Sequence, residues 1–272
     1  MQKRRKRALL YLLISALVAV YLLPILYMVL LSLKKVGSGM GSAFFNSGLT
    51  LENYADVFTS GLYTNYILNG LTVSLSAALI AVVIGFFSAY GVSRFRFPLR
   101  EQMFMGIIAI KAMPPVLMCI AFFQIVVKIH LYDTLSILVI LDAIFNVPLA
   151  VLMLRNFMDA IPRELDEAAQ IDGCRQLRYL CKVVLPLSSA GLAAIFVQCF
   201  LLSWNEYMFA VVFIASEENK MPTVAIFDFI GQWSTNYIGI VTFAVLLSLP
   251  VIVAFVALQK YFVKGMLAGA EK

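Results

Sequence analysis

The chain reads Ile161-Pro-Arg-Glu-Leu-Asp-Glu-Ala-Ala-Gln-Ile-Asp-Gly173 in a charged segment that separates two long apolar runs. Proline suits the first position of a helix and glycine suits the C-terminal cap, so Pro162 and Gly173 predict a short helix between them. One face of that helix carries mostly small or apolar residues at helical spacing. Its members are Leu165, Ala168, Ala169 and Asp172. Because alanine lets another surface approach closely, the segment predicts a helix that docks into a partner.

A second, amphipathic helix is predicted directly after the first, over about 174–184. Its apolar stripe consists of Leu177, Leu180, Cys181 and Val184. Its basic residues lie off that stripe, where they can face water or lipid headgroups; they are Arg175, Arg178 and Lys182. The acidic residues Glu164, Asp166 and Glu167 stand at the N-terminal end of the first helix, where the helix dipole favours negative charge. The two helices predict a helix–turn–helix loop, about 155–188, that projects into the cytoplasm.

The rest of the chain has the composition of a membrane protein. Of its 272 residues, 62% are hydrophobic and 13% are charged, and the mean hydropathy is +0.92. Soluble domains are about 25% charged, so this chain has too few charges to cover a surface in water. Six apolar runs are long enough to span a bilayer. They cover about 8–33, 66–93, 102–127, 134–154, 189–215 and 237–262.

These runs predict an all-α integral membrane fold with six transmembrane helices in a single domain, 1–272. Prolines within four of the runs, including Pro114 and Pro115, predict kinked helices. A further short helix is expected at about 51–58, between the first two runs. Lysine and arginine number sixteen on one side of the predicted spans and four on the other. Since cytoplasmic loops carry the excess of positive charge, both termini are predicted to be cytoplasmic. The net charge of +6 is assigned to this asymmetry, and no nucleic acid is expected as a partner.

The charged loop resembles the EAA loop of ABC-importer permeases. The resemblance rests on Glu167-Ala168-Ala169, on Asp172-Gly173 and, nine residues later, on Val183-x-Leu185-Pro186. Val183 departs from the family pattern, in which isoleucine is usual. The resemblance implies the type I importer permease fold. It also implies that Glu167, Ala168, Ala169, Asp172 and Gly173 belong to a coupling helix that contacts an ATPase subunit.

Other segments are similar to the smaller permease of carbohydrate importers of the maltose-transporter type. They include Trp204-Asn205-Glu206-Tyr207, Pro222-Thr223 and the run from Gln259 to Lys272. This resemblance implies import of a carbohydrate or related polyol across the cytoplasmic (inner) membrane of a bacterium or archaeon. The implied partners are membrane lipid, a second and different permease subunit, two ATPase subunits and a periplasmic or extracellular solute-binding protein.

The sequence contains no set of catalytic residues. It has no G-x-x-x-x-G-K-[ST] segment, so ATP and Mg²⁺ are expected on a separate ATPase subunit and no cofactor is expected on this chain. The single histidine, His130, and four cysteines without metal-type spacing provide no metal site. The chain is therefore predicted to be a transport subunit and not an enzyme.

Polar residues inside the apolar runs are candidates for the solute pathway, because such residues are costly in a membrane. These candidates are Lys111, Asp142, Asn146, Trp204, Asn205 and Glu206. Lys111 and Asp142 could instead pair with each other. Trp204 could stack on a sugar ring, and Asn205 and Glu206 could bind hydroxyl groups. The alternative for all three is a network that joins helices.

Two other classes of function stay open at this point. An ABC permease for an amino acid, phosphate or peptide would carry the same loop, but the C-terminal pattern argues against it. An ATP-independent transporter or a membrane enzyme would have no use for a docking loop. Co-purification of a soluble ATPase would separate these classes.

Overall fold

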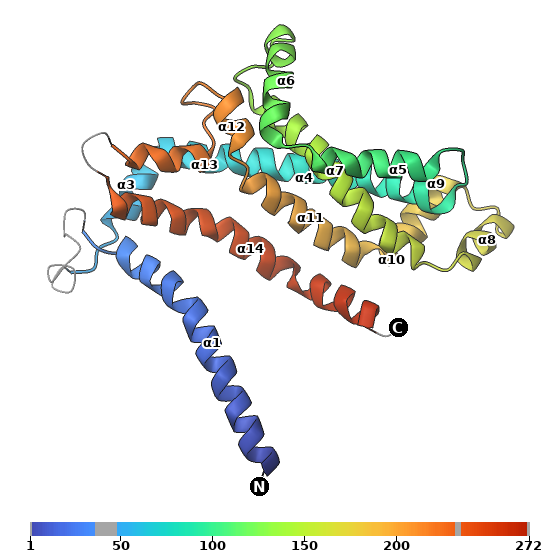
Figure 1. Ribbon diagram of the computed structural model, residues 1–272, viewed down its shortest axis with the longest axis horizontal. Helices are drawn as coiled ribbons and strands as arrows, with labels where there is room; N and C mark the ends of the chain where they lie inside the picture. The colour runs from blue at the N-terminus through green and yellow to red at the C-terminus, as the bar shows by residue number, and fades with distance from the viewer. Residues whose placement is uncertain (1, 36–47, 232–234, 271–272) are drawn as a thin grey trace. The chain divides into compact units, whose positions relative to one another are not determined.

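The computed structural model describes residues 2–35, 48–231 and 235–270, and these are almost entirely helical (Figure 1). The only β-pairing among them is two isolated bridges. Met1 and 271–272, the ends of the predicted domain, lie outside the described residues. Contacts divide the chain into two compact units. The terminal unit comprises Met1–Thr64 and Ala225–Pro250, and the central unit comprises Asn65–Val224 and Val251–Lys272.

The described residues form the following helices. In the order of the chain they are α1 (Gln2–Ser32), α3 (Glu52–Thr59), α4 (Leu62–Arg94), α5 (Arg100–Ala109), η1 (Ile110–Ala112), α6 (Pro115–Lys128), α7 (Leu135–Asp159), α8 (Glu164–Ile171), α9 (Gln176–Tyr179), the π-helical turn η2 (Leu180–Val184), α10 (Leu185–Leu187), α11 (Ser189–Trp204), α12 (Met208–Phe213), α13 (Pro222–Ala225), η3 (Ile226–Phe229) and α14 (Tyr237–Ala270). The short helix expected at about 51–58 is confirmed as α3.

Among the residues that the structure describes, four helical segments are long and apolar enough to cross a bilayer. They are Leu9–Ser32, Leu62–Arg94, Leu135–Asp159 and Tyr237–Gln259. Two further pairs of helices meet the same test only when each pair is taken together. Arg100–Ala112 and Pro115–Lys128 meet at 97°, and Gln176–Leu187 and Ser189–Trp204 meet at 77°. The all-α membrane fold is therefore confirmed, with four spans, or up to six if each bent pair counts as one.

The predicted third helix, 102–127, is two helices with a sharp turn between them. Met113 is extended, with φ −77° and ψ 129°, and Pro114 has φ −62° and ψ 127°. A proline disfavours the helical conformation in the residue before it. Two consecutive prolines therefore end the first helix and allow the second to begin at Pro115, so the expected kink is a full break.

The predicted fifth helix, 189–215, is also interrupted, because α11 ends at Trp204 and α12 begins at Met208. Asn205 Nδ2 donates to the carbonyl of Leu201 at 2.7 Å. The Glu206 carboxylate accepts from the N–H groups of Phe209 (2.7 Å) and Ala210 (3.1 Å). These side chains satisfy backbone groups at the two helix ends. Hydropathy alone does not reveal such a break.

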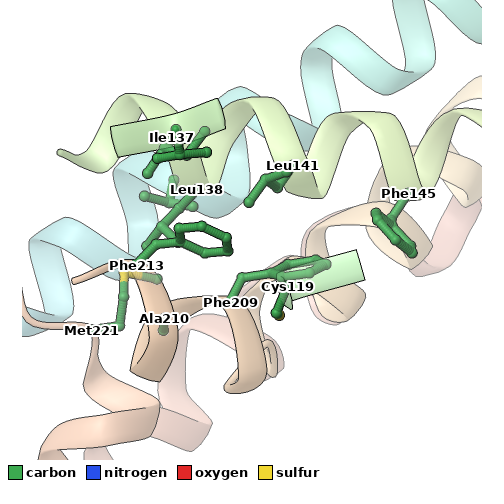
Figure 2. Packing of buried hydrophobic residues seen from close by; sticks show 11 residues of the cluster. Cys119, Ile137, Leu138, Leu141, Phe145, Phe209, Ala210, Phe213 and Met221 are labelled. Carbon is green, nitrogen blue, oxygen red and sulfur yellow. The ribbon is translucent and has the colours of Figure 1, made fainter. Parts of the chain in front are cut away.

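In the central unit, an apolar core joins α7 to α6 and α12 (Figure 2). Phe213, Leu138 and Met221 are each at most 2% exposed. The rings of Phe145 on α7 and Phe209 on α12 lie 5.1 Å apart between centroids. Close packing of this kind fixes the break at 205–207 in position, because α12 is held from two sides.

The terminal unit has its own contacts. Asn53 Nδ2, on α3, donates to the carbonyls of Ser32 (2.7 Å) and Lys34 (2.8 Å), and thereby ties α3 to the end of α1. The ring of Tyr63 stacks on that of Phe229 at 5.0 Å between centroids. By contrast, most side chains of α1 are exposed, and none of its span window is buried.

Candidate functional site

The helix α8 presents its whole length outward, since none of its residues is buried. It begins at Glu164, and the predicted first residue, Pro162, lies in the turn before it. Gly173 has φ +66°, its N–H bonds to the carbonyl of Gln170 at 3.0 Å, and the N–H of Cys174 bonds to that of Ala169 at 2.9 Å. This pair of bonds is a Schellman cap, which needs a residue that tolerates positive φ. The predicted C-terminal cap at Gly173 is confirmed.

On the surface of α8, Glu167 and Ala168 are exposed and Ala169 is half-buried. After the helix, Asp172 and Gly173 are exposed too. The five residues assigned to coupling therefore lie together on one projecting element. In Figure 1, α8 lies at the same end of the central unit as α9 and the beginning of α5.

An ion pair anchors α8 to the end of α4. Arg94 Nε lies 3.1 Å from Asp166 Oδ2, and the two side chains are 7% and 19% exposed. Arg94 Nη2 also donates to the carbonyl of Ile161 at 2.8 Å. Arg163 Nη2 donates to the carbonyl of Ser93 at 3.4 Å, and Ser93 Oγ donates to Asp159. The projecting helix is thus fastened to α4 through its less exposed side.

This anchor was not predicted from the sequence. In the sequence, Arg94 is only one of the positive charges outside the apolar runs, and Asp166 is only one of the acids in the first turn of a helix. A signal was present, because an arginine stands at the end of an apolar run and an acid stands in the next loop predicted on the same side of the membrane. The pairing itself joins residues 72 positions apart, and no local pattern identifies one acid among the three at the start of α8.

Two of the predicted pathway residues are buried between α7 and α11. Asp142 is 4% exposed and Asn146 is 3% exposed. Asn146 Nδ2 donates to Ser203 Oγ at 2.9 Å and to the carbonyl of Cys199 at 3.4 Å. These bonds join two helices inside the chain.

Lys111 lies in η1, at the 97° turn between α5 and α6, and its side chain is exposed. Among the described residues, no ion pair within 4.0 Å joins it to Asp142. The two residues thus form no direct ion pair, and they differ in exposure: Lys111 is exposed at a helix break and Asp142 is buried in the bundle.

Trp204, Asn205 and Glu206 form the corner between α11 and α12. Trp204 is 4% exposed and stacks on Phe200, with 5.9 Å between ring centroids. Its ring also lies against α4, where a Cβ added to Gly70 would be 3.0 Å from it. The Glu206 carboxylate accepts hydrogen bonds from backbone N–H groups at the start of α12. Of the three residues, only Asn205 is exposed. The corner brings the three residues together but turns only Asn205 outward.

At the opposite end of the central unit from α8, the loop 214–221 is held by side-chain hydrogen bonds. Asp133 Oδ1 accepts from the N–H groups of Ala215 and Ser216 and from the Ser216 hydroxyl, each at 3.0 Å. The N–H of Ser216 is the main cause that lowers the pKa of Asp133, because this bond favours the carboxylate form, and burial opposes it. From α4, Asn69 Nδ2 donates to the carbonyl of Glu218 at 2.8 Å.

Replacing Asp133 with asparagine is expected to lower stability at neutral pH and to matter less in acid. The lowered pKa contributes stability above the unfolded value of about 3.9, and this contribution is lost as pH falls through the folded pKa. The Tm difference between wild type and Asp133→Asn should therefore be largest near pH 6 and shrink below about pH 4. Glu218→Gln is the control, because Glu218 holds the loop through its main-chain carbonyl. A Tm difference that does not change with pH would contradict the assignment.

Comparison with known proteins places these features in a family context. The profile of the family described as binding-protein-dependent transport system inner membrane component matches residues 81–268. The chain is 29% identical over 262 residues to the melibiose/raffinose/stachyose import permease protein MelC of Bacillus subtilis, covering 96% of this chain and 95% of that protein. It is 30% identical over 270 residues to the trehalose transport system permease protein SugB of Mycobacterium tuberculosis, covering 98% of each.

Solved structures show the same fold. A chain of a bacterial ABC transporter involved in the import of the polysaccharide alginate matches with a TM-score of 0.77 at 23% identity, covering 96% of this chain and 98% of that one. A chain of the MetNI methionine ABC transporter matches with a TM-score of 0.60 at 18% identity, covering 74% and 95%. At these identities the likeness concerns the fold alone, and it agrees with the predicted type I permease architecture.

Proposed function

The chain belongs to the family of binding-protein-dependent transport system inner membrane components, and on that premise we propose that it is the permease subunit of an ATP-driven importer for a carbohydrate or related polyol. The observation that carries the proposal is α8, a projecting helix with small residues on its surface and a glycine cap at its end. The carbohydrate class is supported by relatives whose names specify oligosaccharide or trehalose transport.

In this proposal, α8 is the contact with an ATPase subunit that binds ATP and Mg²⁺. Movement of that subunit displaces α8, and the Arg94–Asp166 ion pair passes the displacement to α4. A displacement carried by packed helices and ion pairs is a rigid-body form of coupling. The complete importer then contains two ATPase subunits, a second and different permease, and a solute-binding protein outside the membrane. Both termini and α8 face the cytoplasm, in keeping with the distribution of lysine and arginine.

The solute pathway is assigned to the exposed candidates rather than the buried ones. Asp142, Asn146 and Trp204 are each at most 4% exposed and lie against neighbouring helices, so we assign them to helix packing. Glu206 is assigned to the start of α12 for the same reason. Lys111 and Asn205 stand at the two helix breaks with exposed side chains, and these two are the candidates for contact with solute or with the second permease.

Ala168→Arg is expected to abolish association with the ATPase while leaving the chain folded. Ala168 is exposed, so the larger side chain costs this chain little, but it obstructs a close contact with a partner. Gln170→Arg is the matched control, because Gln170 is also exposed and lies about 200° around α8 from Ala168. The measurement is co-purification of the ATPase with each tagged variant, together with uptake of labelled mono- and oligosaccharides and polyols.

Loss of the ATPase and of uptake in Ala168→Arg alone supports the proposal. Equal recovery of the ATPase with both variants would remove α8 from the contact. Uptake that persists without any ATPase would favour an ATP-independent transporter. Uptake of an amino acid or peptide, with no sugar transported, would support an ATP-driven importer but contradict the assignment of a carbohydrate as its substrate.

A further inference from the structure

An apolar groove lies on the central unit, away from the outer face of α8. It encloses about 250 Å³ between α4, the segment from α9 to α10, and the beginning of α11. Phe86 and Leu180 form its buried floor, at 6% and 5% exposed, whereas Phe87 and Leu177 are 52% and 70% exposed at its sides. Every lining side chain is a hydrocarbon except the thiol of Cys181. Such a groove suits a flexible hydrocarbon chain and offers a polar solute nothing to bond.

The segment that forms one wall lies across the direction of α11. Gln176–Leu187 and Ser189–Trp204 are bent by 77° to each other. If α11 crosses the bilayer, the wall segment runs close to the plane of the membrane, as an interfacial amphipathic helix does. Its turn Leu180–Val184 is π-helical, a local widening that is frequent at functional sites.

Two exposed basic residues follow directly after groove residues in this segment. Arg178 comes after Leu177, and Lys182 comes after Cys181. Within the described residues, neither side chain has a hydrogen bond or an ion pair. Two exposed positive charges that neighbour groove residues in the chain match a molecule with an anionic head and an apolar tail, and cytoplasmic membrane leaflets are rich in such lipids.

We propose that this groove binds one acyl chain of an anionic phospholipid, with the phosphate group held by Arg178 and Lys182. The bound lipid braces the wall segment against α4, next to the loop that carries α8. The lipid proposal depends on the proposed function in one respect only: the proposed function puts this segment, and therefore the lipid headgroup, at the cytoplasmic surface. Binding itself needs no ATP, ATPase or solute.

The test is photolabelling of the full-length chain in nanodiscs. Phosphatidylglycerol or phosphatidylcholine carries a diazirine on one acyl chain, and labelled peptides are identified by mass spectrometry. The exposed span Leu9–Ser32 of α1 is the internal reference for bulk lipid. We expect phosphatidylglycerol to label 82–87 and 177–192 more than phosphatidylcholine does, with no such preference in α1.

Arg178→Gln and Lys182→Gln should each lower the ratio of phosphatidylglycerol to phosphatidylcholine labelling in the groove, by roughly fivefold per charge. Lys128→Gln, which removes an exposed charge at the end of α6, should leave it unchanged. Val83→Trp fills the groove from a position that is 47% exposed, and should remove labelling there by either lipid.

If the ratio of phosphatidylglycerol to phosphatidylcholine labelling is the same in the groove as in α1, the proposal is overturned, because the groove then holds bulk lipid only. Labelling in the isolated chain that disappears in the assembled importer would also overturn it, since another subunit would then cover the groove. Failure of the Ala168→Arg experiment would leave the labelling result unaffected, so the two proposals fail separately.

Discussion

Asp166→Ala should lower both the stability of the chain and its coupling to ATP hydrolysis. The alanine leaves the Arg94 guanidinium, whose side chain is 7% exposed, without its carboxylate partner. Breaking a buried ion pair from one side costs on the order of 3 kcal/mol, because the remaining charge stays poorly solvated. We expect a fall of several degrees in Tm, and uptake per ATP hydrolysed should fall as α8 loses its anchor to α4.

Glu164→Ala is the matched control for this change. Glu164 is an acid in the same first turn of α8, but it is exposed, so its removal should cost less than about 1 kcal/mol. The measurements are thermal unfolding of the purified chain and the ratio of uptake to ATP hydrolysis in the reconstituted importer. Equal effects of the two substitutions would show that the ion pair does not transmit movement from α8 to α4.

Gly85→Leu should destabilise the contact between α4 and α7. A Cβ added at Gly85 would lie 2.6 Å from the Cβ of Ala150 and 3.2 Å from its carbonyl carbon, and Ala150 is fully buried. The helices must therefore separate, and overpacking of this kind costs about 1–3 kcal/mol or more. Thermal unfolding should show a lower Tm and a loss of expressed, folded chain.

Gly91→Leu, on the same helix, provides the comparison, since an added Cβ there meets no atom of another segment within 4 Å. Leucine favours helix more than glycine does, so Gly91→Leu should be neutral or slightly stabilising. The pair Gly85→Ala with Ala150→Gly should regain much of the stability lost by Gly85→Ala alone, because it removes the nearest atom. If both leucine variants unfold at the wild-type temperature, α4 and α7 do not pack as closely as described.

The candidate site was accessible from the sequence only in part. The helix α8 and its cap at Gly173 follow from residues that are neighbours in the chain, and glycine at positive φ is a local requirement. The Arg94–Asp166 ion pair, by contrast, does not follow from residues that are neighbours in the chain. Arg94 meets Asp166, and not Glu164 or Glu167, because of the direction in which α8 leaves the membrane helices. That direction depends on the packing of the whole central unit.

The pathway candidates show the same division. Sequence reasoning selected Asp142, Asn146, Trp204 and Glu206 because polar groups in apolar runs are costly. That cost can be met by a solute, by a neighbouring helix or by a nearby backbone group. In this structure, Asn146 bonds to Ser203 on a neighbouring helix, and Glu206 accepts from nearby backbone N–H groups. Composition does not distinguish between them.

The apolar runs themselves settled that this chain is a bundle of membrane helices. In a bilayer each backbone group must bond within its own segment, so a run of twenty apolar residues has little alternative to a helix. The apolar runs did not determine the directions of those helices. The 97° turn at Pro114 and Pro115, the corner at 205–207 and the ion pair of α8 with α4 came only with the tertiary structure. Turns and pairings of this kind depend on contacts between residues far apart in the chain, whereas helix formation depends on residues within one turn of each other.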